Sequence, residues 1–228
     1  MKSVTRVKFR KPVLPGDLLT VAAELKGPVQ GGGFEIHATA SGNGALTCEG
    51  RLIVDLMEPA LVTHPPPALT VPLRQYPGVE FAKAMDINGI LGVLPHRFPF
   101  LLLDRILRLD FEKGNVVAVK HVTGNEPFFA GMPVPVVPLC LELEMAAQAA
   151  CALALKMPGN ENKLGYFMSI DQGTWHAPVV PGDQLLIDMT IAGRGRFGTG
   201  EGKLYVGETP VTEMALKFAL VDREPGKA

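Results

Sequence analysis

The feature that most constrains this chain is an apolar stretch at residues 128–156, which contains no glycine from Leu139 to Lys156. Ala, Leu and Met dominate this part, and these residues lose the least free energy on entering a helix. Pro138 suits a first helical position, where its missing N–H is not needed, and Pro158-Gly159 supplies a stop. A helix that is apolar on nearly every side must be buried on nearly every side. We therefore expect a long helix at the centre of the fold.

Two carboxylates, Glu142 and Glu144, interrupt the apolar surface of this helix. A helix of about 18 residues approaches the length of a membrane span, but two carboxylates within one turn argue against a lipid environment. An ionised group is costly to bury alone, so a carboxylate in a core helix usually has a partner or a chemical task. Glu142 points to another side of the helix than Glu144, and we expect it to be partnered or to face an interface.

The composition argues against several classes of protein. Lys and Arg total 22 against 23 Asp and Glu, without a basic run, so we expect no nucleic-acid partner. The charged N-terminus lacks the continuous apolar stretch of a secretory signal. Cys48, Cys140 and Cys151 have no metal-ligand spacing and are expected to be buried thiols in a reducing cytoplasm. We therefore expect no metal.

Three segments follow from the residue pattern. Residues 1–57 alternate polar and apolar side chains, with turns at PGD and SGNG, and are predicted to form strands without a covering helix. Residues 58–84 are rich in proline and are predicted to be a semi-extended linker. Residues 85–228 predict a short helix, a structured loop, two strands, the long helix and three or four closing strands. The expected architecture is α+β, one long helix enclosed by an antiparallel sheet.

An internal repeat connects the first and third segments. Residues 12–19, PVLPGDLL, match residues 178–185, PVVPGDQL, so the offset from 12 to 178 is 166 residues, about the length of one domain. The first copy has no counterpart of the long helix, because Met1 lies just upstream of the matching strand. Residues 1–57 are therefore expected to be the C-terminal part of one unit, followed by a complete second unit. Such a turn can also arise for structural reasons alone, so the repeat supports a shared fold more than a shared chemistry.

Four motifs of residues 85–228 resemble those of one family: MDINGILGVLPHRFPFLLLDRI, KHVTGNEPFFAG, PVVPLCLELEMAAQ and WHAPVVPGDQL. They occur in the order seen in 3-hydroxyacyl-[acyl-carrier-protein] dehydratases of the hotdog fold. The resemblance implies a homodimer that removes water from a 3-hydroxyacyl thioester in fatty-acid or polyketide-type biosynthesis, and the cysteines already favour a cytoplasmic location. It also implies an acyl chain carried on the phosphopantetheine of acyl carrier protein, or as a CoA thioester, in a tunnel beside the helix. No cofactor is expected.

The chemistry of that family needs a base for the α-proton and an acid for the leaving hydroxyl. By position the family's helix carboxylate is Glu144, with Gln148 one turn further on the same face. The family's histidine does not carry over, because Met132 follows Gly131 and the loop is two residues shorter. The expected tunnel or supporting residues are Gln148, Gly131, Met132, Phe129, Leu139 and Cys140, with Leu139 in place of the glycine that normally starts the helix.

Three interpretations of the missing histidine remain open. It could come from the absent part of the first unit or from another polypeptide, or it could be replaced by His37, His121 or His176, with His121 and His176 as the alternative bases. In the third interpretation the site is inactive, and the protein binds an acyl chain or supports an assembly. A hotdog thioesterase is a further alternative. His96, in LPHRFPF, is expected to be structural, a loop histidine bonded to backbone.

Overall fold

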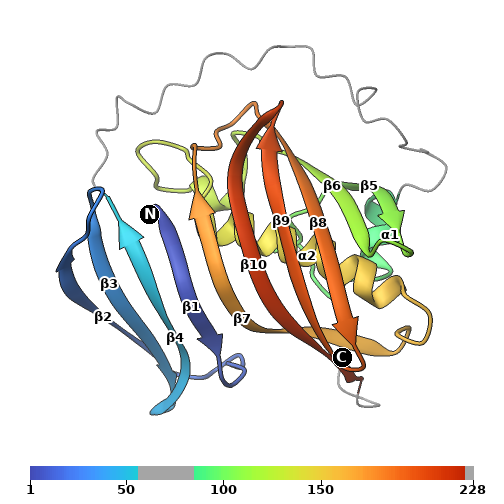
Figure 1. Ribbon diagram of the computed structural model, residues 1–228, viewed down its shortest axis with the longest axis horizontal. Helices are drawn as coiled ribbons and strands as arrows, with labels where there is room; N and C mark the ends of the chain where they lie inside the picture. Colours follow the sequence, from blue (N-terminus) through green and yellow to red (C-terminus); the bar gives the residue numbers. More distant parts are fainter. Residues whose placement is uncertain (56–84, 224–228) are drawn as a thin grey trace.

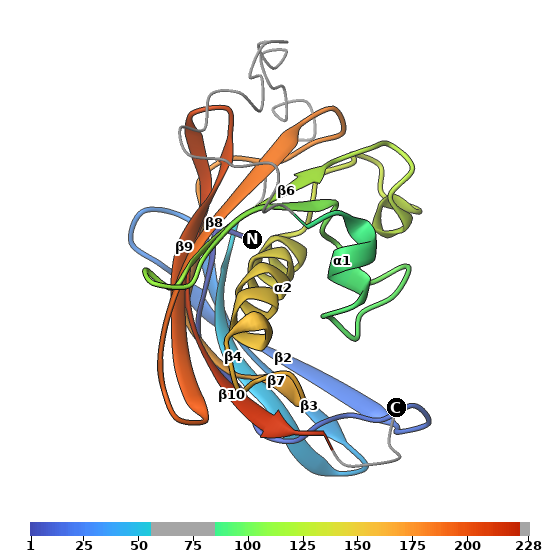
Figure 2. The same cartoon turned by 90° about the vertical axis from the view of Figure 1, so that its right-hand side faces the viewer.

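The computed structural model describes residues 1–55 and 85–223. Ten strands form one antiparallel sheet in the order β2-β3-β4-β1-β7-β10-β9-β8-β6-β5, and a long helix lies in its concave face (Figures 1 and 2). The strands are β1 (Ser3–Phe9), β2 (Leu19–Pro28), β3 (Phe34–Gly42), β4 (Ala45–Val54), β5 (Arg105–Asp110), β6 (Asn115–His121), β7 (Lys163–Trp175), β8 (Gln184–Arg194), β9 (Phe197–Val206) and β10 (Thr209–Asp222). The helices are α1 (Ile87–Leu91) and α2 (Leu139–Lys156), with a 3-10 turn at Pro127–Phe129.

The central helix is α2, which begins directly after Pro138 and ends before Met157. Ala146, Ala149 and Leu153 on this helix are inaccessible to solvent. They belong to one hydrophobic core with side chains of the sheet and of the segment around α1. The expectation of a long buried helix wrapped by an antiparallel sheet, the hotdog arrangement, is confirmed.

The sheet contains two copies of the same four-stranded motif, arranged about the β1–β7 pair. In the first copy the order outward is β1-β4-β3-β2, and in the second it is β7-β10-β9-β8. The repeated PGD turns are alike in detail. Leu14 N donates to Asp17 Oδ2 at 2.8 Å, and Val180 N donates to Asp183 Oδ2 at 2.9 Å. The glycines of both turns have positive φ values, +96° for Gly16 and +102° for Gly182, which glycine adopts without steric cost.

The two copies differ in what covers them. Strand β8 pairs with β6 along its outer edge and packs against α2, whereas β2 ends the sheet and pairs only with β3 among the described residues. Positions related by the offset of 166 residues show the consequence. Leu19 is 46% exposed and Val21 67% exposed, whereas Leu185 and Ile187 are both 0% exposed. Among the residues that the structure describes, nothing therefore covers this apolar face of the first copy, as its lack of a helix predicts.

The edge of β7 is occupied by a strand of the same chain. Strand β1 pairs with β7 from Ser3 opposite Thr174 to Lys8 opposite Ser169, so residues of the first segment extend the sheet of the complete unit. In the described part of the chain, the sheet therefore ends at β2 and β5. The expected linker, residues 58–84, lies outside the described residues, and the division of the chain at 57 and 85 stays a prediction.

One predicted strand starts later than expected. The run from Phe100 to Asp110 predicts a continuous strand, but β5 begins only at Arg105. The physical reason is that the preceding backbone is bonded elsewhere: Leu102 N donates to the side chain of Gln148 on α2 at 2.9 Å. This detour brings the loop between α1 and β5 against the central helix.

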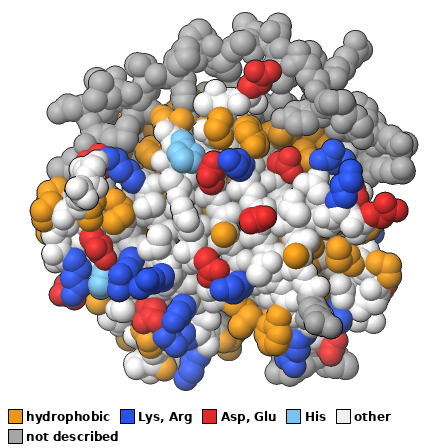
Figure 3. Space-filling model, viewed as in Figure 1, with side chains coloured by type: hydrophobic (Ala, Val, Ile, Leu, Met, Phe, Trp, Pro, Cys, Tyr) orange, Lys and Arg blue, Asp and Glu red, His pale blue; other side chains and the backbone are white. Residues whose placement is uncertain are grey.

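The outer face of the sheet carries acidic and basic side chains interspersed with one another (Figure 3). No helix within residues 1–55 and 85–223 is long and apolar enough to cross a membrane.

Candidate active site

Glu144 lies in the second turn of α2, with its side chain 17% exposed. It lines two cavities, one of about 210 Å³ that runs beside the helix and one of about 750 Å³ that lies between the helix and the first four strands. The helix thus holds a carboxylate where both cavities reach it. This is the arrangement expected of a proton-transfer group that must meet an acyl substrate.

Gln148, one turn further along α2, is 1% exposed and holds the Glu144 carboxylate in place. Its Nε2 donates to Glu144 Oε1 at 2.9 Å and to Phe100 O at 2.8 Å, and its Oε1 accepts from Leu102 N. One buried amide therefore fixes both the catalytic candidate and the loop that precedes β5. The prediction that Gln148 supports Glu144 on the same helix face agrees with these contacts.

That loop places His96 beside Glu144. The Nε2 atom of His96 lies 3.4 Å from Glu144 Oε1, and the imidazole is 26% exposed. Arg97 Nη1 donates to the carbonyl oxygens of Leu94 and His96, both at 2.8 Å, and so holds the backbone on either side of the ring. The expectation that the ring bonds to backbone is not met in the described residues, because Nδ1 of His96 is buried without a hydrogen-bond partner.

Most of the smaller cavity is apolar, and its polar lining comes from the His96–Glu144–Gln148 group and from Tyr166. Its walls include Phe100, Cys151, Phe167 and Leu220. Burial, followed by the nearby charge of Glu144, raises the pKa of the Cys151 thiol to about 12. The thiol therefore stays protonated at neutral pH and is a poor nucleophile. Glu144 and His96, which contact each other, are the proton-transfer candidates of this cavity.

The larger cavity is bounded by β1, β3 and β4 on one side and by α2 and β7 on the other. Val7, Phe9 and Leu52 face it from the strands, and Cys140 and Leu143 from the helix. Cys140 is exposed, and Cys48 and Cys151 are intermediate. The expectation of three buried thiols is therefore wrong for Cys140 and only partly met for Cys48 and Cys151, which are half-buried. Cys140 is exposed because the first four strands stand away from this side of the helix.

Glu142 has a different environment from Glu144. It is 0% exposed, and its Oε2 accepts a hydrogen bond from the Thr212 hydroxyl on β10. Burial raises the pKa of this carboxyl to about 8, against the lowering effects of Thr212 and of the Trp175 indole. Its Oε1 has no hydrogen-bond partner among the described residues. Glu142 is thus a partnered core carboxyl that does not line either cavity of Glu144.

Four other expected tunnel or supporting residues lie at the start of α2 or in the segment before it. Phe129 is 8% exposed and Leu139 is 4% exposed, both within the hydrophobic core. Gly131 has a φ of +78°, and Met132 is 38% exposed. In the described part of the chain, none of the four lines a cavity that Glu144 reaches, so their assignment to the tunnel stays a prediction.

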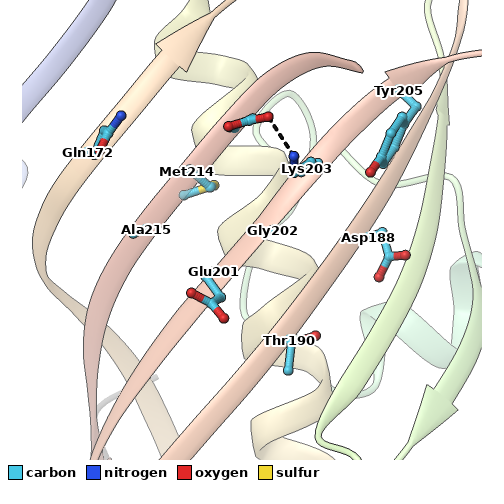
Figure 4. A pocket seen from close by; sticks show the side chains of 10 residues that line it. Gln172, Asp188, Thr190, Glu201, Gly202, Lys203, Tyr205, Met214 and Ala215 are labelled. Atoms are coloured by element: carbon cyan, nitrogen blue, oxygen red, sulfur yellow. Dashed lines mark ion pairs between the residues drawn. The ribbon is translucent and has the colours of Figure 1, made fainter. Parts of the chain in front are cut away.

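The two alternative bases are held in other places on the surface. His121 lies near Asp104, 3.3 Å from Nδ1 to Oδ2, and its Nε2 contacts Gln184 Nε2 at 2.8 Å. His176 Nε2 lies 3.7 Å from Glu213 Oε1. Glu213 also pairs with Lys203. Both residues line an open hollow on the outer face of the sheet, to which polar and apolar side chains contribute (Figure 4).

Neither histidine lines the cavities of Glu144, whereas His96, which the sequence indicated to be structural, does. The spacing of His96 and Glu144 in the sequence does not predict this contact, because the contact depends on the path of the loop between α1 and β5.

Comparisons with known proteins agree with the hotdog arrangement. The model of the FabA-like domain family matches residues 94–215. The chain is 43% identical over 139 residues to the 3-hydroxyacyl-[acyl-carrier-protein] dehydratase FabZ of Desulforamulus reducens, covering 60% of this chain and 97% of that protein. It is 52% identical over 112 residues to FabZ of Aromatoleum aromaticum, covering 47% and 77%.

Solved structures show the same fold at low sequence identity. The dehydratase domain from the CurJ module of curacin polyketide synthase aligns with a TM-score of 0.65 at 14% identity, over 97% of this chain and 76% of that one. The TesB protein of Mycobacterium avium subsp. paratuberculosis aligns with a TM-score of 0.60 at 12% identity, over 96% and 78%. Both alignments extend over the first four strands as well as the complete unit. On the family model and the FabZ relatives, the chain belongs to the FabA-like domain family.

Proposed function

We propose that this protein is a 3-hydroxyacyl-thioester dehydratase of fatty-acid or polyketide-type biosynthesis. The reaction removes a proton from C2 and the hydroxyl from C3 and leaves a trans-2-enoyl thioester and water. Glu144 is the acid–base group on the central helix. Five FabZ relatives that are 40–52% identical to this chain support this assignment.

One observation carries the proposal: Glu144 is a carboxylate that Gln148 holds in an apolar cavity, with an imidazole within reach. Elimination of water needs removal of a proton from C2 and donation of a proton to the hydroxyl oxygen on C3. A site shielded from bulk water strengthens the electrostatic interactions that assist both transfers. The apolar walls beside Glu144 suit an acyl chain, because such a chain offers only hydrophobic contacts.

The finer details are proposals as well. The substrate is an acyl chain on the phosphopantetheine of acyl carrier protein, or on CoA, in a cytoplasmic protein that needs no cofactor. The active unit is a homodimer. Since β1 already occupies the edge of β7, the dimer would have to form through another surface, such as the edges at β2 or β5. Light scattering coupled to size-exclusion chromatography would measure the mass directly. A mass of 24.4 kDa, that of the monomer, at the assay concentration would refute the homodimer proposal.

Hydration of a crotonyl thioester is the reverse of this dehydration, and measuring it tests the proposed reaction. We expect Glu144→Gln to lower kcat by a factor on the order of 100 to 10,000, the usual contribution of a positioned acid or base. Glu112→Gln is the matched control, since Glu112 is an exposed glutamate between β5 and β6 and should leave the rate unchanged. Equal hydration rates for wild type and Glu144→Gln, or no hydration by either protein, would refute the proposal that this protein is a dehydratase. Release of free thiol without hydration would identify a thioesterase instead.

A further inference from the structure

We infer that His96 is the second catalytic residue, so that His96 and Glu144 form an acid–base pair within one unit of the chain; this inference rests on the proposed dehydratase. The chain lacks a histidine after FFAG, where Met132 stands. The structure supplies an imidazole to the same carboxylate from a different segment, the loop between α1 and β5.

The loop holds the ring in a defined place. Gln148 bonds to Phe100 O and to Leu102 N, and Arg97 bonds to the carbonyls of Leu94 and His96. The bond from Gln148 to Glu144 belongs to the same network. The positions of the imidazole and the carboxylate are therefore coupled through one buried amide, as a pre-organised site requires.

The surroundings of the ring favour chemistry over a structural ion pair. Both partners line the same apolar cavity of about 210 Å³, and the 3.4 Å separation of Nε2 and Oε1 is longer than a charge-assisted hydrogen bond. The Nδ1 atom is buried without a partner. A buried donor or acceptor left unpaired costs free energy, so a ring selected only to stabilise the loop would be expected to satisfy it. The other described histidines, His37, His121 and His176, do not line this cavity.

The proton balance can be closed by these two groups. Glu144 as the carboxylate accepts the proton from C2, and the electron pair of that C–H bond forms the C2=C3 double bond. The C3–O bond breaks as the His96 imidazolium gives its proton to the hydroxyl, which leaves as water. The pair is then a neutral imidazole and a carboxylic acid. Transfer of one proton from Oε1 to Nε2 across their contact restores the starting state, so no external acid, base or oxidant is needed.

The test compares His96→Gln with His121→Gln in the hydration of crotonyl-CoA by the full chain. His96→Gln should lower kcat by a factor on the order of 100 or more, with KM changed much less, since the lost interaction is made in the transition state. His121→Gln removes a surface imidazole and should stay within about twofold of wild type, the range of a change away from the site. Thermal unfolding of each variant shows whether the fold is kept.

A second measurement uses the unaltered protein and does not depend on a variant that folds. Diethyl pyrocarbonate acylates accessible imidazoles, and peptide mapping by mass spectrometry reports each site. Loss of hydration activity should follow modification of His96, and crotonyl-CoA should protect both. Full activity with His96 modified, or a folded His96→Gln variant with wild-type kcat, would overturn the inference while leaving the dehydratase in place. An inactive wild type would instead overturn the proposed function.

Discussion

Replacement of Glu142 by glutamine should change how the stability of the protein depends on pH. Burial raises the pKa of this carboxyl from 4.5 to about 8, whereas in the unfolded chain it titrates near its ordinary value. Between these two values the folded state keeps a proton that the unfolded state releases. The unfolded state thus binds fewer protons, so the free energy of unfolding falls as pH rises through this window.

The size of the effect follows from the shift. One pH unit is worth about 1.4 kcal/mol for a single proton. Between roughly pH 5 and pH 8 the contribution of Glu142 should therefore decline by an amount on the order of 4 kcal/mol and then level off. Glutamine has nearly the same shape, still accepts the hydroxyl of Thr212 and cannot ionise. Glu142→Gln should accordingly match wild type near pH 5 and exceed it by a few kcal/mol near pH 8.

The assay is urea unfolding followed by tryptophan fluorescence at several pH values. Trp175 is the one tryptophan of the chain, and its indole influences the Glu142 carboxyl, so the signal reports on this part of the core. Other titrating groups are common to both proteins, and the difference between the two profiles isolates Glu142. Glu112→Gln, at an exposed position, should follow the wild-type profile. A difference profile that is flat from pH 5 to pH 8 would refute the reasoning.

Three further predictions concern Gln148, the matched positions Ile187 and Val21, and Gly165. Gln148→Leu leaves loop backbone groups and Glu144 without their partner. It should lower the free energy of unfolding in urea by about 2–4 kcal/mol and abolish most of the hydration activity. Wild-type activity would show that the amide does not position His96 and Glu144. Ile187→Ala should lower the free energy of unfolding by about 2–5 kcal/mol, whereas Val21→Ala, at the matching exposed position, should lower it by less than about 1 kcal/mol. Equal losses of stability would mean that β2 is covered in solution. Gly165→Ala places a methyl group 2.6 Å from a thiol sulfur in the smaller cavity and should raise KM for crotonyl-CoA; an unchanged KM would place the acyl chain in the larger cavity.

Local pattern alone was sufficient for much of the fold. The apolar run after Pro138 predicts α2 correctly, because a helix without a polar face can only be stable when it is surrounded. The PGD turns predict the repeat, because the conformation of such a turn is determined by its own residues. Its glycine adopts a positive φ and its aspartate side chain accepts a hydrogen bond from the nearby backbone. Glu144 and Gln148 could be paired from the sequence for the same reason, since residues four apart share one face of a helix.

The contact between His96 and Glu144 could not be predicted in this way, because it depends on a loop that leaves the expected strand register to bond with Gln148. The exposure of β2 is also a tertiary property. Val21 and Ile187 stand in matching places of the same repeat, yet one is 67% exposed and the other 0%. A strand's own residues determine that it can bury an apolar face, but what lies against that face is decided by the rest of the chain, through contacts distant in sequence.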